Sequence, residues 1–224
     1  MDELLDRILK EIEKKISLEP ITLPEDLKRV KLPLGLMDMY CFNYKSERVR
    51  KMYFMRFKAV RSLDVLGMAI YPESVLDLPI FVSDLSGSKK KVFTYINFIP
   101  LFKEPSYITR YIEPMKLIFD KYNHFPPHKV RDWMKPYLSP YAIYSIPERT
   151  HLEELKSCVV DYLALYLDFF SQAEEIKDIS YQDEVKRAQE KYTSDLTTYD
   201  ASRKMLGRII GMGRTNRIFQ EVIS

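Results

Sequence analysis

The chain has 224 residues, 46% of them hydrophobic, and its 35 basic and 32 acidic side chains leave a formal charge of +3 at pH 7. This length allows one sizeable core, so we expect a single domain over residues 1–224. A charge so near balance gives no reason to expect nucleic acid or an anionic membrane as partner. The two cysteines, Cys41 and Cys158, are far apart in sequence, which favours a reducing compartment over a disulfide framework.

The first segment is predicted to be an amphipathic helix. Over residues 3–16, leucine and isoleucine recur at 3.6-residue spacing. Charges of both signs interrupt this pattern, so it lacks the apolar run of a signal peptide or a membrane span, and no later window supplies one. We therefore expect a cytoplasmic protein that makes no membrane contact.

A sheet is predicted between residues 35 and 100, where short runs of tyrosine, phenylalanine, valine and isoleucine alternate with turn-forming or charged clusters. The predicted strands are Met37–Tyr44, Lys51–Val60, Asp64–Tyr71, Ile80–Leu85 and Lys91–Phe98. Their short connections require neighbouring strands to run antiparallel.

The second half is predicted to be mainly helical. A helix over 107–122 precedes a proline-punctuated stretch, a short strand is expected at Tyr141–Ile146, and helical patterns resume from Glu148. A further helical stretch runs over Asp178–Leu206, before a glycine-rich turn and a last short helix. This order predicts an α/β fold, a three-layer α/β/α sandwich with a central, mainly antiparallel sheet flanked by helices on both faces.

Two possible motifs are set aside. The glycines of residues 211–214 lack the preceding strand and the following residues of a phosphate-binding loop. His124 and His128 have a spacing that places two imidazoles on one helical face, but Pro126 and Pro127 between them exclude a continuous helix. The third histidine, His151, is distant in sequence, so we predict no metal site.

Asp84 is the first candidate catalytic residue. It lies on a predicted strand among apolar neighbours that include Val82 and Leu85. Burial of an aspartate on a sheet raises its pKa toward the range that suits proton donation at neutral pH. From this pattern alone, a solvated or hydrogen-bonded aspartate near a strand end is the commoner outcome, so both interpretations stay open.

The residues that lead to Asp84 form a distinctive series. Tyr71–Pro72, the Asp-Leu-Pro of residues 77–79 and then Asp84 resemble, without a gap, a motif of the ferredoxin-dependent bilin reductases, a family that includes the phycoerythrobilin-, phytochromobilin- and phycocyanobilin-forming enzymes. Near the C-terminus, Asp200 and Arg203, followed by a glycine-containing turn and a short helix, are similar to the family's closing pattern. The resemblance extends loosely from about Lys45 to the end.

The resemblance implies roles for several residues. Asp84 corresponds to an aspartate on the central sheet that protonates the tetrapyrrole, and Asp200 to a helix aspartate on its opposite side that acts as a second, more mobile donor. Gly67 stands where family members carry histidine or asparagine, and Met55 where the phycocyanobilin-forming branch has a glutamate. Tyr53, on the strand before Gly67, is a candidate for the pocket wall.

Substrate carboxylates need basic partners, and here the chain departs from the family pattern. Ser145 occupies a position where some members have an arginine that pairs with a propionate. Guanidinium groups pair with carboxylates in bidentate fashion, so the C-terminal arginines are the candidates for this role. They are Arg203, Arg208, Arg214 and Arg217.

The resemblance implies that the chain binds no metal or flavin and reduces biliverdin or a related bilin, including dihydrobiliverdin, with single electrons from reduced ferredoxin or flavodoxin. Lys89, Lys90 and Lys91, with the C-terminal arginines, are candidates for a basic rim that attracts this acidic donor. Nothing in the sequence requires association, so we expect a monomer. Two alternatives remain: a reductase of an opened chlorophyll catabolite, and a tetrapyrrole-binding protein with no catalysis or with altered specificity.

Overall fold

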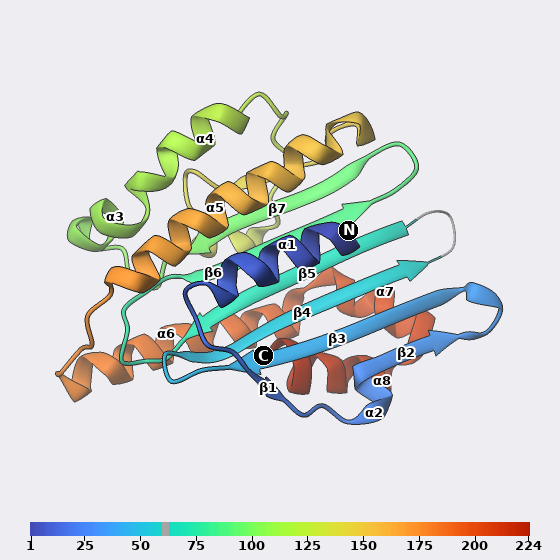
Figure 1. The fold of residues 1–224 in the computed structure, drawn as a ribbon, viewed down its shortest axis with the longest axis horizontal. Helices are drawn as coiled ribbons and strands as arrows, with labels where there is room; N and C mark the ends of the chain where they lie inside the picture. The colour runs from blue at the N-terminus through green and yellow to red at the C-terminus, as the bar shows by residue number, and fades with distance from the viewer. Residues whose placement is uncertain (60–62) are drawn as a thin grey trace.

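An eight-stranded antiparallel sheet forms the middle layer of the computed structural model (Figure 1), which describes residues 1–59 and 63–224. The strand order is β1-β3-β4-β5-β6-β7-β8, and β2 pairs with β3 beside β1. The strands are β1 (Glu19–Ile21), β2 (Arg29–Leu32), β3 (Met37–Lys45), β4 (Val49–Ala59), β5 (Leu63–Pro72), β6 (Ile80–Gly87), β7 (Val92–Ile99) and β8 (Ile143–Ser145).

The predicted central strands are confirmed, with ends that differ by a few residues. Val60, the predicted end of the second strand, lies outside the described residues. β1 and β2 were not predicted from the sequence. Both are short and lie at the sheet edge, where Pro20 of β1 is tolerated.

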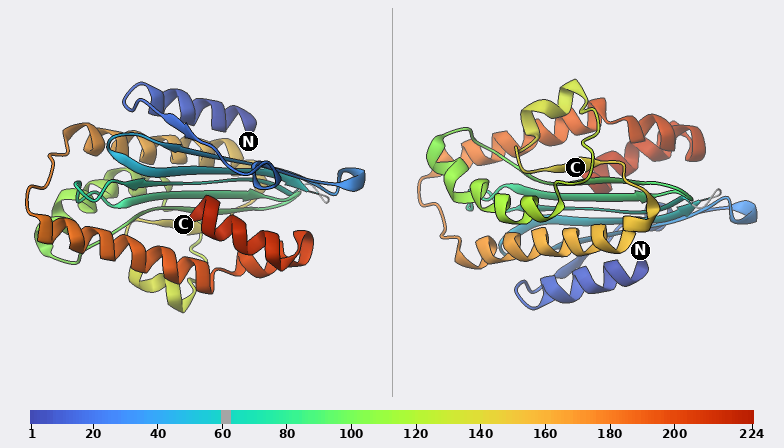
Figure 2. Two further views of the ribbon diagram at one scale, coloured as in Figure 1. Left: turned by 90° about the horizontal axis from the view of Figure 1, so that it is seen from below. Right: turned by 90° about the horizontal axis from the view of Figure 1, so that it is seen from above.

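Helices cover both faces of the sheet, as predicted, and Figure 2 shows the three layers edge-on. The first face carries α1 (Asp2–Glu13), α3 (Pro105–Tyr111), α4 (Lys116–Tyr122) and α5 (Leu152–Gln172), whose apolar side chains share one core with the sheet. The second face carries α6 (Ile179–Tyr199), α7 (Ala201–Ile210), α8 (Met212–Arg217) and a π-helical turn, Ile218–Ile223. A single turn, α2 (Glu25–Lys28), precedes β2.

Two predicted helices are broken in the structure. The helix predicted over 107–122 is interrupted by a 3₁₀ turn at Glu113–Met115, because Pro114 has no amide hydrogen to continue it. The helix predicted over Asp178–Leu206 ends at Tyr199, and Asp200 takes an extended backbone (φ −65°, ψ 126°) before α7 begins. Gly207 lies within α7, so the turn is made by Gly211 at φ +84°.

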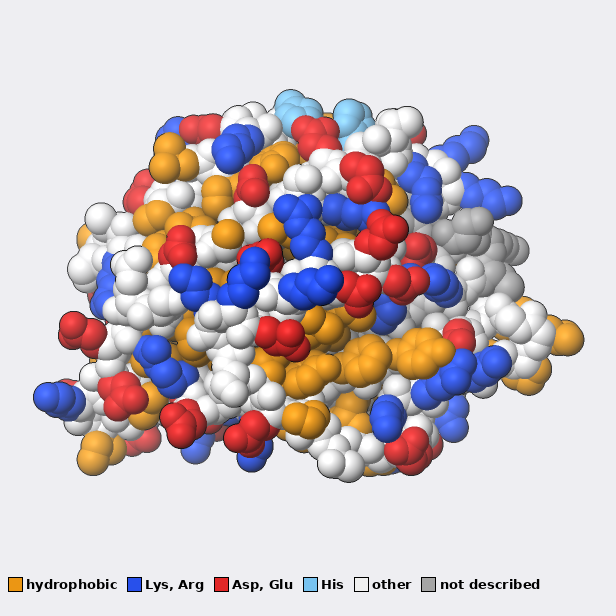
Figure 3. Space-filling view, viewed as in Figure 1, with side chains coloured by type: hydrophobic (Ala, Val, Ile, Leu, Met, Phe, Trp, Pro, Cys, Tyr) orange, Lys and Arg blue, Asp and Glu red, His pale blue; other side chains and the backbone are white. Residues whose placement is uncertain are grey.

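The core explains why these segments take these places. On α1, Leu4, Ile8 and Ile12 are each no more than 2% exposed, which fixes this helix against the sheet through one apolar stripe. The centre of β5 is buried on both faces, as expected for a strand in the middle of a covered sheet. Basic and acidic side chains are interspersed on the outside of the α1 face (Figure 3). Among the described residues, no helix combines the length and apolar character needed to cross a membrane.

Candidate active site

A cavity of about 550 Å³ lies between the second face of the sheet and the helices that cover it. Its floor follows one row of residues across the sheet. Antiparallel register places Met55, Gly67, Asp84, Tyr95 and Tyr144 opposite one another on β4 to β8. Directly opposed residues point to the same face of a sheet, so this row brings all five to the cavity that they line.

The helical wall of the cavity comes from α6 and α7. Tyr192, Leu196 and Met205 line it, and Asp200 lies at the junction between the two helices. The apolar core of this face is divided into two clusters, one around Leu206 and Phe219 and the other containing Tyr192. Residues of both clusters line the cavity.

The third wall is the irregular segment of residues 124–134, which crosses from the end of α4 to the side of α6 (Figure 2). The His128 amide donates a hydrogen bond to the Tyr144 carbonyl (2.8 Å), and its imidazole stacks on the Tyr144 ring at 5.8 Å between centroids. Lys129, Arg131 and Trp133 follow His128 along the cavity. This wall therefore contributes positive charge and aromatic surface.

Asp84 is the acid on the floor. Burial raises the pKa of Asp84 to about 7; the hydrogen bond from the Ser86 hydroxyl to Oδ1 (2.9 Å) opposes this rise, and the negative charge of Asp200 adds to it. A carboxyl group with this pKa is protonated in a large fraction of molecules at neutral pH. Asp84 can therefore deliver a proton to a molecule that occupies the cavity.

Asp200 lines the cavity and also caps a helix. Its Oδ1 accepts a hydrogen bond from the Ser202 amide (2.6 Å), which makes Asp200 the N-cap of α7. The negative charge of Asp200 also contributes to the raised pKa values of Tyr53 and Tyr95, after the larger effect of burial. The second carboxylate oxygen is the one available to a ligand.

The cavity brings together half of the residues predicted for the site: Asp84, Asp200, Gly67, Tyr53 and Met55. Ser145 does not line it, because its hydroxyl is directed to the Pro126 carbonyl, to which it donates a hydrogen bond of 2.8 Å.

The four C-terminal arginines do not line the cavity either. Arg203 donates hydrogen bonds to Asn216 Oδ1 (2.8 and 3.1 Å), and Arg217 pairs with Asp26 (2.6 Å) and Glu221 (2.8 Å). Arg208 and Arg214 are exposed. The geometry thus gives no support for a substrate contact from Ser145, Arg203, Arg208, Arg214 or Arg217.

The basic residues that do line the cavity are Lys129 and Arg131, and neither was predicted from the sequence. They lie in a stretch without helical or strand periodicity, so no pattern indicated which way they face. The only signal was the density of basic and aromatic residues after Pro127.

Comparisons with known proteins agree with this architecture. The model of the family described as ferredoxin-dependent bilin reductase matches residues 5–223. The chain is 27% identical over 225 residues to phycoerythrobilin:ferredoxin oxidoreductase from Nostoc punctiforme, covering 92% of this chain and 86% of that protein. It is 24% identical over 230 residues to 15,16-dihydrobiliverdin:ferredoxin oxidoreductase from Gloeobacter violaceus, covering 98% and 92%.

A solved structure has the same fold. The crystal structure of phytochromobilin synthase from tomato in complex with biliverdin superposes with a TM-score of 0.91 at 20% identity, covering 97% of this chain and 80% of the tomato chain. At this identity the match supports the fold, and the chemistry rests on the cavity and on the family model.

Proposed function

The chain belongs to the ferredoxin-dependent bilin reductase family, and on this premise we propose that it reduces a linear tetrapyrrole, biliverdin or a dihydrobiliverdin, with electrons from reduced ferredoxin. The observation that carries the proposal is Asp84, whose pKa is raised to about 7 on the floor of a cavity of about 550 Å³. Such a volume is within the range of sites for molecules of this size.

Each reduced double bond takes up two electrons and two protons. Ferredoxin supplies the electrons one at a time, and the Asp84 carboxyl supplies a proton to the bilin and is left as a carboxylate. This carboxylate is held by the Ser86 hydroxyl until solvent returns a proton. Aspartate acts here as a general acid with a pKa matched to neutral pH.

Asp200 is the second donor, and it acts from the helical wall. Two features support this: it lines the cavity, and its charge raises the pKa of Asp84 on the floor. Its Oδ1 accepts the Ser202 amide hydrogen bond that begins α7, which fixes the carboxyl group on the helical wall. Because the two acids face a flat ligand from different sides, their relative contributions determine which bond is reduced.

Lys129 and Arg131 are the partners of the substrate's propionate groups. Both line the cavity, and within residues 1–59 and 63–224 neither makes an ion pair with an acidic side chain. A guanidinium and an ammonium group without acidic partners are available to carboxylates.

The electron donor approaches the end of the cavity near the β6–β7 hairpin. Ser86 and Phe93, which line the cavity, lie on the two strands that this hairpin joins, and its tip carries the exposed Lys89 and Lys90. Positive charge at this position attracts a small acidic protein and speeds its encounter.

The proposal is tested by anaerobic incubation with biliverdin or 15,16-dihydrobiliverdin, ferredoxin and a reductant, followed by absorbance spectra and product chromatography. We expect both the bilin spectrum and the retention time to change with wild type, and at least about a hundredfold more slowly with Asp84→Asn. Tight binding of both bilins without any turnover by wild type would overturn the proposal in favour of a non-catalytic tetrapyrrole-binding protein. Turnover only of an opened chlorophyll catabolite would reassign the substrate.

A further inference from the structure

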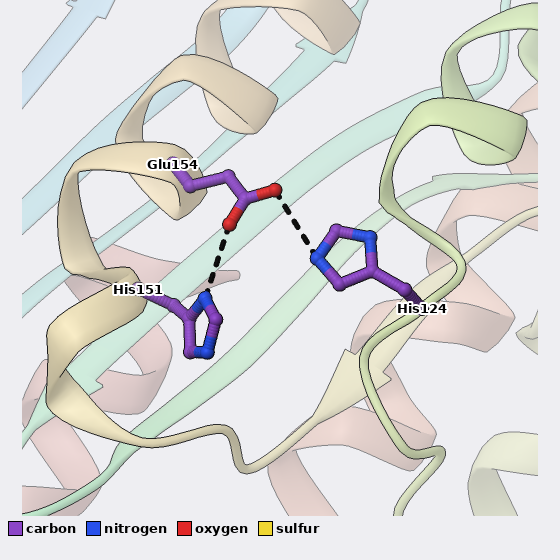
Figure 4. A group of neighbouring side chains, drawn as sticks. All are labelled: His124, His151 and Glu154. Carbon is purple, nitrogen blue, oxygen red and sulfur yellow. Dashed lines mark hydrogen bonds and ion pairs between the residues drawn. The ribbon is translucent and has the colours of Figure 1, made fainter.

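The fold brings together two histidines that are far apart in sequence. His124 follows α4, His151 closes the 3₁₀ turn Arg149–His151, and Glu154 lies in the first turn of α5 (Figure 4). Glu154 Oε1 is 3.1 Å from His124 Nε2, and Glu154 Oε2 is 3.1 Å from His151 Nδ1. One carboxylate thus faces two imidazoles that come from two different segments.

This arrangement has the donor set and the dimensions of a transition-metal site. One ligand atom from each residue lies within 4.8 Å of the others. A tetrahedral Zn²⁺ with bonds of about 2.0–2.1 Å needs ligand atoms about 3.3 Å apart. The two 3.1 Å contacts use different oxygens of Glu154, so binding requires the ligand atoms to move closer together. The His124 and His151 side chains, 48% and 43% exposed, have the freedom to do so.

The surroundings leave room for a fourth ligand. Histidine side chains reach the surface beside an acidic one at the edge of the face in Figure 3, so water can complete the tetrahedron. The Phe125 side chain is 5% exposed and packs edge-on against His151, with 5.3 Å between ring centroids, which limits the positions of this imidazole. Two imidazoles and one carboxylate suit Zn²⁺ among the common divalent ions, whereas Mg²⁺ and Ca²⁺ prefer oxygen ligands.

We propose that His124, His151 and Glu154 bind one divalent transition ion of the zinc type. The site lies outside the cavity, at the point where the cavity-wall segment of residues 124–134 leaves α4. The bound ion ties the start of this segment to the first turn of α5. Hydrogen bonds to β8, such as the one from the Ser145 hydroxyl to the Pro126 carbonyl, hold the next part of the segment.

The test measures metal binding by tag-free protein, without any bilin or ferredoxin. Zn²⁺ is titrated by calorimetry and by competition with a chromophoric chelator, and Co²⁺ by its visible absorption spectrum. We expect one ion per chain and, for Co²⁺, the intense bands of a four-coordinate site. His124→Ala, His151→Ala and Glu154→Gln should each weaken Zn²⁺ binding by at least about tenfold.

Matched controls separate this site from adventitious binding. Glu153→Gln removes the neighbouring exposed carboxylate, which pairs with Lys156, and His128→Ala removes the remaining histidine; both should bind Zn²⁺ as wild type does. Zn²⁺ should raise the melting temperature of wild type and of the controls but not of His151→Ala. Absence of one-to-one binding by wild type, or equal binding by the His151→Ala and His128→Ala variants, would overturn the proposal.

Discussion

Gly67 lies directly opposite Asp84 in the antiparallel register of β5 and β6, and a Cβ at position 67 would meet no atom of the described residues within 4 Å. The space beside the candidate acid is therefore open, and Ser86 is the hydrogen-bond partner that the described residues offer to its carboxylate. This relationship makes position 67 a place to tune the acidity of Asp84 without disturbing the packing.

Gly67→Asn should shift the pH dependence of bilin reduction to lower pH. The new amide can donate a hydrogen bond to the Asp84 carboxylate, which favours the charged form and lowers its pKa, by about one unit. The measurement is the rate of reduction from pH 5.5 to 8.5. Gly213→Asn, at another glycine with open space but outside the cavity, is the control. A pH profile identical to that of wild type would show that a side chain at position 67 does not change the pKa of Asp84.

Asp84→Asn should lower the rate of reduction by at least about a hundredfold, because an amide cannot supply the proton. In wild type, the raised pKa of about 7 leaves Asp84 largely protonated at pH 6 and largely ionised at pH 8. The rate should therefore fall as pH rises through 7, and the residual rate of Asp84→Asn should lack this step. The exposed Asp168→Asn on α5 is the control. A wild-type rate that rises through pH 7 would exclude Asp84 as the acid.

The strand that carries Asp84 followed from local sequence patterns. A run of β-forming residues between turn-forming clusters predicted the strand, and the short loops predicted antiparallel neighbours, whereas the roles of Asp84 and Asp200 came from the family resemblance. The register that sets Gly67 against Asp84 depends on the full length of both strands and their turn, which no single pattern encodes. The sequence predicted Asp200 to lie inside a helix, because the amphipathic pattern continues across it. Aspartate is also a preferred N-cap residue, and in the structure Asp200 caps α7 by accepting the Ser202 amide hydrogen bond.

The walls were harder to predict for a different reason. Residues 124–134 have no periodicity, so the directions of Lys129 and Arg131 depend on contacts with β8, such as the His128–Tyr144 hydrogen bond. The same crossing segment brings His124 to His151. Arginines of the C-terminal stretch looked suitable by charge alone, but Arg217 is already paired with two carboxylates, and such internal pairing is not visible in a sequence.

Two substitutions at Asp200 should separate its roles as cap and as proton donor. Asp200→Asn retains a good N-cap and should leave the free energy of unfolding within about 0.5 kcal/mol of wild type, whereas Asp200→Ala should lower it by about 1 kcal/mol. Both should change the ratio of bilin products, measured by chromatography. Asp178 caps α6 through the Ser180 amide (2.9 Å), so Asp178→Ala should lower stability alone. An unchanged ratio of bilin products with both Asp200 variants would show that Asp200 acts only as the N-cap of α7 and not as a proton donor.

Arg131→Ala and Lys129→Ala should each weaken biliverdin binding by about tenfold, equivalent to about 1.4 kcal/mol, because each removes a positive charge that faces the cavity. Arg217→Ala is the matched control, since this arginine pairs with Asp26 and Glu221 instead. The measurement is the change in bilin absorbance on titration with protein. A larger loss for Arg217→Ala than for Arg131→Ala would return the propionate site to the C-terminal stretch.

Reversing the charge of the β6–β7 hairpin should slow the encounter with ferredoxin. For Lys89→Glu/Lys90→Glu we expect kcat/KM for ferredoxin to fall by about three- to tenfold at low ionic strength, with bilin affinity unchanged. The difference from wild type should shrink as salt is added, because exposed charges are screened beyond about 10 Å at 0.1 M salt. Lys10→Glu on α1, exposed on the opposite face of the sheet, should leave kcat/KM near wild type. An equal loss for Lys10→Glu would show that net charge, not the hairpin, governs the encounter.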